Sequence, residues 1–324
     1  MDLFAIEMNY CTIFRHNNTE VNAMEYNTKH KSDLKLIPRH KSFSIPNFKK
    51  IFKNASYCHI HRKKRILITG AGSGLGENAV FALASRGHFV YASTHTEEQA
   101  QRINTINQKI GLPLKSFKLD VLCDEDRKKI FDLNIDVLIN NAAIGDSGSI
   151  AEIDVNKYRQ TFETNVFCPI ELTQLVLKQM IKNGYGRIIF ISSLAGRIPI
   201  PFLSPYCATK FALEDIAQSL NSELKNLKNV NIPVILIEPG SYATGFNEKN
   251  ISRQFQNPNS DSYYRHRIYK LKLKQFSYFK LTESINFDSI IDKYIHAVED
   301  EHPKLRYIAP SSQGCYTKFR DIIK

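Results

Sequence analysis

Residues 65–76 read RILITGAGSGLG, a short apolar run followed by a turn rich in glycine. The run predicts a buried strand, and the apolar spacing over residues 75–86 predicts a helix that begins at the turn. Glycine lets the backbone turn tightly and approach a phosphate closely, while a helix N-terminus offers unpaired N–H groups and the positive end of its dipole. This strand–turn–helix unit therefore predicts a site for a phosphate-bearing ligand.

Strands and helices alternate along the rest of the chain. We expect strands over residues 89–93, 114–119, 137–140, 187–191 and 233–237, and helices over residues 96–109, 124–132 and 205–227. Each strand is apolar nearly throughout, as a parallel sheet covered on both faces requires. The predicted fold class is α/β, a doubly wound parallel sheet of about seven strands with helices on both faces. Ligands of such sheets bind beyond the carboxyl ends of the strands.

The composition is that of a soluble globular protein. The chain has 324 residues, of which 43% are hydrophobic and 23% are charged. It has no apolar run long enough to span a membrane, and its first residues carry acids where a secretory signal needs positive charge. Six cysteines without a Cys-x-x-Cys pair are typical of free thiols in a reducing compartment. We therefore expect a cytoplasmic protein.

Residues 1–60 differ from the rest of the chain. The formal net charge is +12, and residues 1–64 hold 12 Lys and Arg against 5 Asp and Glu. A basic arm can attract an anionic membrane or a nucleic acid, although no groove-binding motif occurs here. A solvated, poorly ordered extension and a start codon placed too early are the alternatives. We expect residues 61–324 to form a single domain and no nucleic acid to bind.

Two further motifs follow predicted strands. Residues 140–143 read NNAA, whose small residues suit close packing against a flat ligand. Ser193 follows the strand at 187–191, and Tyr206 and Lys210 come one helical turn apart soon afterwards. An ammonium beside a phenol stabilises the phenolate, so we expect a lowered pKa for Tyr206. Such a tyrosine can act as a general acid or base near neutral pH.

Together these motifs resemble the short-chain dehydrogenase/reductase family of NAD(P)-dependent oxidoreductases, which have a Rossmann-type sheet. The resemblance spans about residues 65–310 and includes PGSYAT at residues 239–244; Ala143, where the family usually has glycine, is the one small departure. It implies an enzyme that interconverts an alcohol and a ketone or aldehyde. A dinucleotide-binding regulator or scaffold that uses the basic arm is the alternative, but it would have no need of Ser193, Tyr206 and Lys210 together.

The resemblance also assigns roles. Tyr206 would exchange the proton with the substrate oxygen, Ser193 would hydrogen-bond that oxygen, and Lys210 would contact the nicotinamide ribose. Asn165 would hold a water that links Lys210 to solvent. The residues implied in cofactor binding are Thr69, Gly70, Ser73, Gly74, Leu75, Gly76, Thr94, His95, Asp120, Val121, Asn141, Ala142, Ala143, Tyr206, Lys210, Pro239, Gly240 and Thr244.

The residues at the end of the second predicted strand indicate whether NAD or NADP is preferred. Enzymes of this fold that use NAD place an acid there to bind the ribose 2′-hydroxyl. Ser93, Thr94 and His95 occupy that position, so a hydroxyl and a potential cation replace the acid. This favours NADP over NAD.

The substrate side is predicted to be apolar. Ser193, Tyr206, Ile144, Pro199 and Phe202 are the candidate contacts, and residues 246–284 form a candidate lid rich in aromatic residues. A bulky apolar substrate such as a steroid, a retinoid or another lipid would suit such a lid, but the rings could instead serve only to pack the lid on the core. Basic residues at 265–274 suit either an anionic membrane surface or a solvated helix face.

The sequence also bears on oligomer formation and metal binding. The helices near 166–181 and 205–227 carry more apolar positions than one face against a sheet can bury, which predicts a homodimer. His59 and His61 have no further ligand types nearby in sequence, so we expect no metal site.

Overall fold

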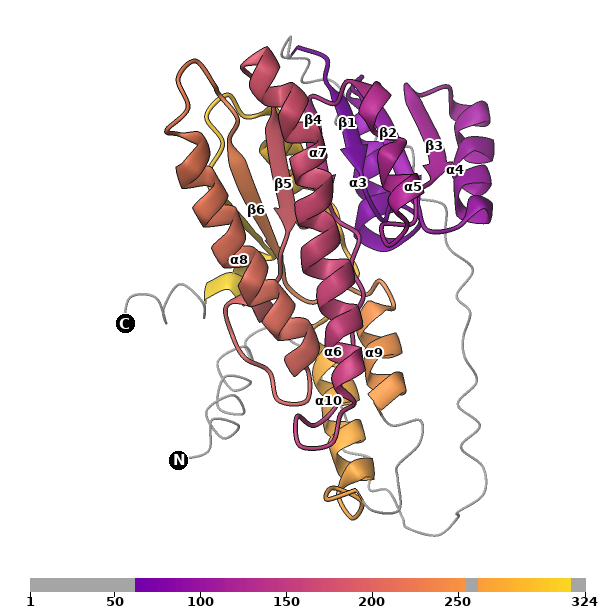
Figure 1. Ribbon diagram of the computed structural model, residues 1–324. Coiled ribbons are helices and arrows are strands. Elements are labelled where there is room, and N and C mark those ends of the chain that lie inside the picture. Colours follow the sequence, from indigo (N-terminus) through magenta and orange to yellow (C-terminus); the bar gives the residue numbers. More distant parts are fainter. Residues whose placement is uncertain (1–61, 255–261, 316–324) are drawn as a thin grey trace. The chain divides into compact units, whose positions relative to one another are not determined.

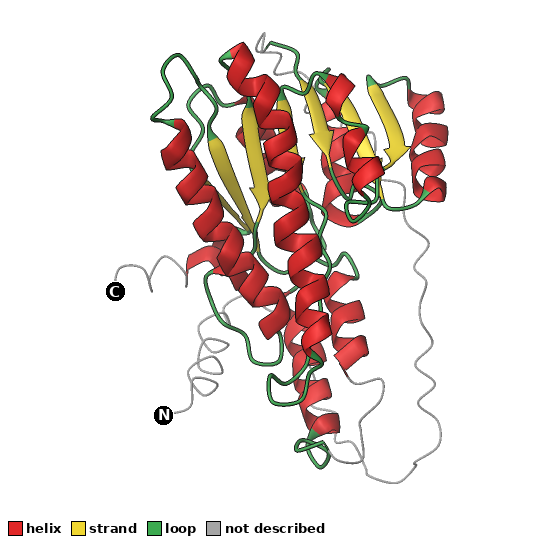
Figure 2. Cartoon of the chain, viewed as in Figure 1, coloured by secondary structure: helices red, strands yellow, loops and turns green. Residues whose placement is uncertain are grey.

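The computed structural model describes residues 62–254 and 262–315. Its centre is one sheet of seven parallel strands in the order β3-β2-β1-β4-β5-β6-β7 (Figures 1 and 2). The strands are β1 (Arg65–Ile68), β2 (Phe89–Thr94), β3 (Leu114–Lys118), β4 (Val137–Asn140), β5 (Arg187–Ile191), β6 (Val234–Pro239) and β7 (Arg306–Ala309). The predicted α/β architecture is confirmed.

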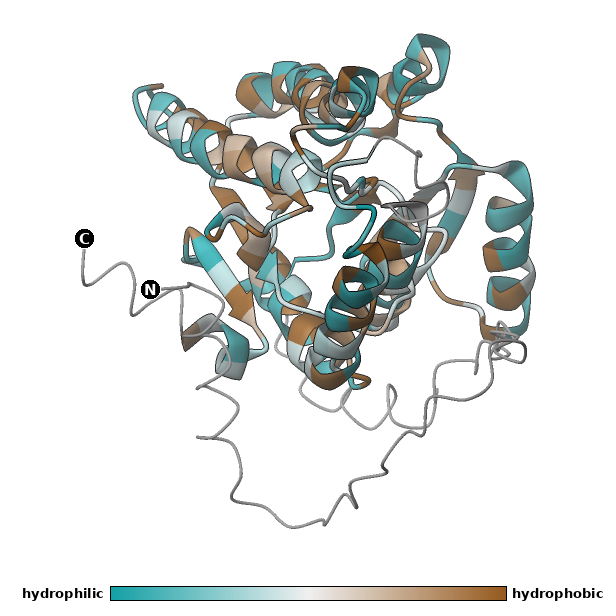
Figure 3. Ribbon diagram, turned by 90° about the horizontal axis from the view of Figure 1, so that it is seen from below, coloured by the Kyte–Doolittle hydropathy of each residue, from teal (hydrophilic) through white to brown (hydrophobic). Residues whose placement is uncertain are grey.

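Helices cover both faces of the sheet. One face packs against α3 (Gly74–Ser85), α4 (Glu97–Ile110) and α11 (Asp288–Glu299), and the other against α7 (Cys168–Asn183) and α8 (Ser204–Leu224). The short α5 (Asp124–Lys128) follows β3, and α6 (Val155–Phe162) runs through a π-helical turn at Glu163–Phe167 into α7. In Figure 3 hydrophobic and hydrophilic segments share the same helices, as expected of helices that bury one side.

Alternating side chains of each central strand enter the two cores. In β1, Ile66 and Ile68 join the core under α3 and α11, and Leu67 joins the core under α7. The edge strand β3 differs, because Lys115 and Lys118 are exposed there. The predicted strands lie within one or two residues of the observed ones, whereas β7, α6 and α11 had not been located from the sequence.

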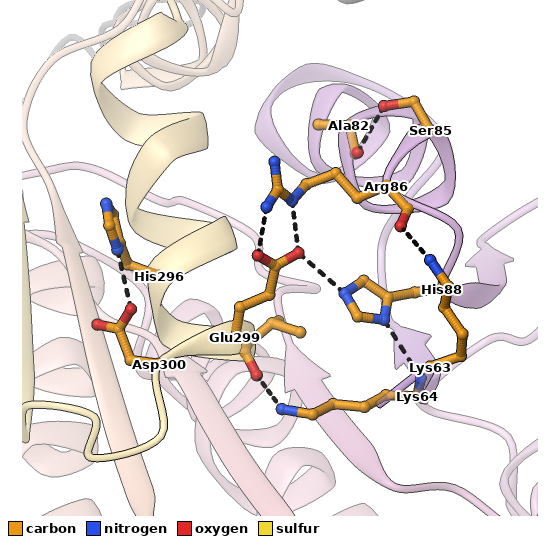
Figure 4. A network of polar contacts seen from close by, with 10 residues as sticks. Lys63, Lys64, Ala82, Ser85, Arg86, His88, His296, Glu299 and Asp300 are labelled. Atoms are coloured by element: carbon orange, nitrogen blue, oxygen red, sulfur yellow. Dashed lines mark hydrogen bonds and ion pairs between the residues drawn. The ribbon is translucent and has the colours of Figure 1, made fainter. Parts of the chain in front are cut away.

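A compact ionic cluster joins α3 to α11 near the amino ends of the strands (Figure 4). Glu299 accepts hydrogen bonds from Arg86 at 2.5 and 2.6 Å and contacts His88 Nε2 at 3.0 Å. His88 Nδ1 in turn accepts the Lys64 N–H at 3.2 Å, so Nε2 carries the hydrogen that Glu299 receives. Burial raises the pKa of Glu299, but the bonds from His88 and Arg86 outweigh this effect and lower it to about 2.

The opposite edge of the sheet carries the loops and helices that form the candidate site. Loops leave the carboxyl ends of the strands there, and α9 (Phe246–Gln254) and α10 (Ile268–Thr282) lie beyond those ends (Figure 1). Parallel pairing therefore brings together residues that follow β1, β2, β4, β5 and β6, although they are far apart in sequence.

Candidate active site

The glycine-rich turn lies tightly against the loop that follows β4. Gly70 and Gly74 both have φ of +63°, a conformation that other residues rarely adopt. A Cβ on Gly70 would lie 2.6 Å from the Ala142 Cα, and one on Gly76 would lie 2.4 Å from the Asn141 Nδ2. Ser73, the N-cap of α3, accepts no side-chain bond from its helix, so among the described residues no cap competes with a ligand for the first N–H groups of α3.

Hydrogen bonds join this turn to residues 141 and 142. The Thr69 hydroxyl accepts the N–H groups of Asn141 and Ala142, both at 3.0 Å. The Asn141 amide donates to the carbonyls of Thr69 at 2.8 Å and Gly70 at 3.1 Å, and it accepts the Tyr294 hydroxyl at 2.9 Å. The sequence analysis missed Tyr294, a fully buried residue of α11. Asn141 therefore holds the glycine-rich turn in place, and the small Ala142 allows the turn to approach the β4 loop closely.

Ser193, Tyr206 and Lys210 come together beyond the end of β5. Ser193 follows β5 as the N-cap of a short 3-10 turn, and its hydroxyl hydrogen-bonds to the Tyr206 phenol. Tyr206 and Lys210 lie in the first two turns of α8, with the Lys210 Nζ 5.5 Å from the centre of the Tyr206 ring. Nζ donates to the Ile191 carbonyl at 2.7 Å, which ties the lysine to the end of the strand.

Burial determines the protonation of this group. It raises the pKa of Tyr206, and the hydrogen bond with Ser193 opposes the rise only in part. It also lowers the pKa of Lys210 to about 7, against a raising effect of Glu214. The prediction of a lowered Tyr206 pKa is therefore wrong for the protein groups alone, while the effect of a protonated Lys210 stays a prediction. The physical reason is that loss of water disfavours the phenolate more strongly than its neighbours favour it.

Asn165 lies in the π-helical turn between α6 and α7. Its amide accepts the Ile144 N–H at 2.8 Å and donates to the Ile144 carbonyl at 2.8 Å and to Thr209 Oγ1 at 3.1 Å. The side chain therefore positions the β4 loop beside α8 through three hydrogen bonds to two residues. Its role in holding a water stays a prediction.

The loop after β6 reaches the glycine-rich turn. A Cβ on Gly74 would lie 3.4 Å from the Thr244 side chain, and a Cβ on Gly240 would clash with Gln313 at 2.1 Å. The Pro239 carbonyl accepts a long bond of 3.4 Å from the Ser193 hydroxyl. Pro239 therefore lies beside Ser193, and Thr244 lies beside the glycine-rich turn.

The end of β2 corrects one prediction. Thr94 is fully buried, and its hydroxyl donates to the Thr96 carbonyl at 2.9 Å, so it does not face a ligand's phosphate. His95 is exposed, with its Nδ1 3.7 Å from Asp120, whose neighbour Val121 is buried. Arg102, which sequence reasoning missed, donates to Glu77 at 2.7 Å and to the Gly72 carbonyl at 2.9 Å. His95 thus directly follows β2, and Arg102 lies against the glycine-rich turn through its bond to Gly72.

A second ionic cluster lies next to Lys210. Glu238 of β6 is fully buried, and its carboxylate lies 3.3 Å from Arg197 and 3.0 Å from Arg306. Arg306 also contacts Glu214 Oε2 at 3.1 Å, while Glu214 Oε1 is buried without a partner among the described residues. Burial and the nearby Glu214 raise the pKa of Glu238. The position of Glu238 before Pro239-Gly240 was the only sequence signal for this cluster.

Aromatic rings from the candidate lid meet the predicted substrate residues. The Phe246 ring centre lies 5.4 Å from that of Tyr206, and Phe202 and Tyr264 pack edge to face at 5.3 Å. Phe279 and Tyr206 both pack on the small cluster of Ala195, Leu203 and Cys207. Ile144 and Pro199 are exposed at the surface. Phe255, also assigned to the lid, lies outside the described residues.

Other expectations concern groups away from the cleft. Cys123, Cys168, Cys207 and Cys315 have free thiols. Within residues 62–254 and 262–315, no cluster of metal-ligand side chains occurs, and no helix is both long and apolar enough to cross a bilayer. His59, His61 and most of the basic arm lie outside the described residues.

Comparisons with known proteins identify the family to which the chain is similar. The profile of the short chain dehydrogenase family matches residues 64–254. An uncharacterized oxidoreductase of Bacillus subtilis, YusZ, is 34% identical over 76% of this chain and 88% of its own. A 3-ketodihydrosphingosine reductase of Bacteroides thetaiotaomicron is 31% identical over 58% of this chain and 67% of its own.

A solved structure supports the fold. A short-chain dehydrogenase from Streptomyces avermitilis superposes with a TM-score of 0.66, at 24% identity, over 81% of this chain and 94% of its own. Because the family profile covers more than half of the chain and the Bacillus relative is 34% identical over 88% of its own length, the chain belongs to the short-chain dehydrogenase/reductase family of NAD(P)-dependent oxidoreductases that act on CH–OH groups.

Proposed function

We propose that this protein interconverts an alcohol and a ketone or aldehyde on a bulky apolar substrate, with NADP as the preferred cofactor. The observation that carries the proposal is the convergence of Ser193, Tyr206 and Lys210 beside rings from α9 and α10. Tyr206 can transfer a proton, and the adjacent rings can hold the apolar body of a substrate.

The residues of the cleft fit a dinucleotide. The first turn of α3 and the cradle of Gly70, Gly74 and Asn141 would hold the pyrophosphate, since a Cβ at either glycine would be strained. Gly240 and Thr244 would border the nicotinamide, and Asp120 and Val121 would border the adenine. The nicotinamide supplies the hydride when it is bound, and the protein supplies position and electrostatics.

The chain's own groups handle the proton. Tyr206 would donate its proton to the carbonyl oxygen in reduction and accept one from the alcohol in oxidation. Ser193 would donate a hydrogen bond to the same oxygen and stabilise the charge that develops there. Lys210, when protonated, would place a positive charge 5.5 Å from the phenol ring and favour phenolate formation.

Cofactor preference depends on the surface beyond β2. No acid occurs at residues 93–95, and the exposed His95 and the partly exposed Arg102 can face the 2′-phosphate of NADP. Arg102 is held by Glu77, so it is oriented along the edge of the cradle. A 2′-phosphate would gain an electrostatic contact there, whereas a 2′-hydroxyl would find no carboxylate at this position.

The substrate class follows from the lining. The Phe246 ring lies beside Tyr206 and Phe279 packs on the same small apolar cluster, so a flat or long apolar chain would bury more of these rings than a small sugar would. The name of the Bacteroides relative gives 3-ketodihydrosphingosine, a long-chain ketone, as the substrate of that protein. We therefore place lipid-like ketones and alcohols first.

A screen tests the proposed function. Purified protein is assayed with aliphatic, steroid, retinoid and sugar substrates, with NADP(H) and NAD(H) in parallel, by the absorbance of the reduced nicotinamide. We expect the largest kcat/KM for an apolar substrate with NADPH. A higher kcat/KM with NADH would overturn the cofactor assignment, and turnover restricted to polar sugars would overturn the substrate class.

Homodimer formation is proposed separately. Phe167 and Phe211, from the π-helical turn before α7 and from α8, expose 49% and 39% of their surface, although Met180, Leu213 and other predicted interface residues are buried within the chain. The apolar excess is therefore smaller than the sequence suggested, but it persists on these two helices. Light scattering at micromolar concentration should show a dimer; a monomer would contradict this proposal.

A further inference from the structure

Helix α10 leaves several large apolar side chains at least half exposed in the part of the chain that the structure describes. None of its residues from Ile268 to Thr282 is buried. Tyr269, Leu273, Tyr278 and Leu281 expose 67%, 49%, 51% and 80% of their surface. Scattered exposed apolar residues are normal, but several on one helix usually mark an interaction surface.

The pattern around the helix separates two faces. Ile268, Leu271, Phe276 and Phe279 are partly buried at helical spacing, and this face is turned toward the protein. Tyr269, Leu273 and Leu281 follow a second helical row, and with Lys270, Lys274, Tyr278 and Lys280 they define what we name the docking face. A surface helix with one partner normally carries apolar residues on one side only. Apolar side chains on both sides indicate a second partner.

The charge of the segment indicates which partner. Residues 263–282 contain six lysines and arginines and no aspartate or glutamate. Basic side chains beside exposed tyrosine and leucine are typical of helices that lie in the interface of an anionic membrane, where apolar groups enter and lysines contact head groups. A second copy of this chain would place the same positive charge against itself, which disfavours self-association.

The helix is anchored at both ends, so the docking face is held in place. Before α10, Glu152 accepts the Tyr263 N–H at 2.6 Å and the Ser262 hydroxyl at 3.0 Å. At the other end, Gln313 donates to the Thr282 carbonyl at 2.7 Å. Figure 1 shows α10 beyond the carboxyl ends of the strands, on the side where the candidate site lies.

We propose that the docking face of α10 binds the surface of an anionic lipid membrane. The opposite face of the same helix places Phe279 against the small cluster of Ala195, Leu203 and Cys207, on which Tyr206 also packs. A membrane under α10 would therefore lie next to the mouth of the active site, where an apolar substrate could enter from the lipid. Delivery of a substrate in this way rests on the proposed function, whereas membrane binding itself does not.

Vesicle sedimentation tests the proposal with the full-length protein and no cofactor. The vesicles contain either phosphatidylcholine alone or phosphatidylcholine with one third phosphatidylglycerol. One variant carries Lys270→Glu, Lys274→Glu and Lys280→Glu, and a second carries Tyr269→Ser, Leu273→Ser and Leu281→Ser. A matched control reverses three exposed lysines elsewhere, with Lys109→Glu, Lys115→Glu and Lys225→Glu.

We expect binding to the anionic vesicles only. Both α10 variants should lower the partition coefficient by about tenfold or more, since each basic residue near such a surface and each buried apolar group contributes to binding. The control should bind within a few-fold of the unaltered protein. Thermal unfolding should be unchanged in all variants, because every altered side chain is exposed.

Three results would overturn the proposal. The first is no binding of the unaltered protein to anionic vesicles, and the second is an equal loss in the control. The third is full binding by the serine variant with loss only in the glutamate variant, which indicates a polyanion site. Equal binding of the unaltered protein and the serine variant to heparin would identify that site. Turnover of a water-soluble carbonyl compound measures the proposed function independently of these outcomes.

Discussion

Buried charged groups differ between the two ends of the strands, which we call the amino edge and the carboxyl edge of the sheet. At the amino edge, Glu299 is bonded to Arg86 and His88, and its pKa falls to about 2 (Figure 4). At the carboxyl edge, burial lowers the pKa of Lys210 to about 7 and raises that of Tyr206. The amino edge stabilises the charged form of its carboxylate, while burial at the carboxyl edge favours the neutral forms and brings Lys210 close to a change of protonation.

The difference indicates that the ionic cluster at the amino edge stabilises the fold, whereas the buried groups at the carboxyl edge can take part in proton transfer. A carboxylate with two strong partners stays ionised at every physiological pH, so it can hold α3 to α11 but cannot exchange protons. Groups that burial moves toward neutrality are costly to the fold, and such groups concentrate at functional sites. Glu238 shows the same tendency near Lys210, because burial and Glu214 raise its pKa despite contacts with Arg197 and Arg306.

The largest effect is expected at the carboxyl edge. Tyr206→Phe removes the proton donor and leaves the ring, so kcat should fall by about 10²–10⁴-fold with little change in dinucleotide affinity. Steady-state kinetics and cofactor titration measure both quantities. Tyr185→Phe, at the amino edge, is the matched control and should keep full activity. More than a tenth of the original rate in the Tyr206 variant would show that another group transfers the proton.

A substitution in the ionic cluster at the amino edge should lower the stability of the protein. Glu299→Gln should lower the free energy of unfolding by about 2 kcal/mol, because water screens part of the gain implied by the pKa shift. Since the folded pKa lies below the unfolded value of 4.5, this stabilisation is present above about pH 4.5 and is lost toward pH 2. Denaturant unfolding from pH 3 to 7 measures it. Glu301→Gln, an exposed neighbour, should change little; an equal loss there would contradict the assignment.

A smaller effect is expected where the carboxyl-edge cluster meets Lys210. Glu214 raises the lysine pKa, so Glu214→Gln should lower it further and move the pH at which Lys210 loses its proton to lower values. The kcat profile should shift in that direction, with a few-fold loss at neutral pH and little change in KM. Asp215→Asn, on the exposed side of α8, is the control. An unshifted profile in the Glu214 variant would show that the cluster only supports the fold.

The smallest effect is expected from removal of residues 1–56. A protein that begins at Tyr57 should fold and keep kcat within a few-fold, because the first strand and all candidate catalytic residues follow that position. Activity and thermal unfolding of the shortened protein measure this. Loss of cofactor binding would show that the basic arm is part of the domain.

The sequence alone determined the sheet and the main site residues. Strands such as residues 187–191 are apolar on both faces, and this pattern needs no tertiary information to be read. Parallel strands place their following loops at one edge, so Ser193, Tyr206 and the glycine-rich turn could be assigned to one cleft. The edge strand β7 was missed because it is not apolar throughout: it begins with Arg306, and only Tyr307 and Ala309 are buried.

Only the tertiary structure decided what surrounds those residues. Tyr294 meets Asn141 across 153 positions of sequence, and Arg306 meets Glu214 across 92, so no local pattern announces either contact. Burial likewise cannot be read from Thr94 or Tyr206 themselves; it turned the Thr94 hydroxyl away from the cleft and raised the tyrosine pKa. Residue types identified the chemistry, whereas the loss of water around them, which depends on distant segments, set their protonation.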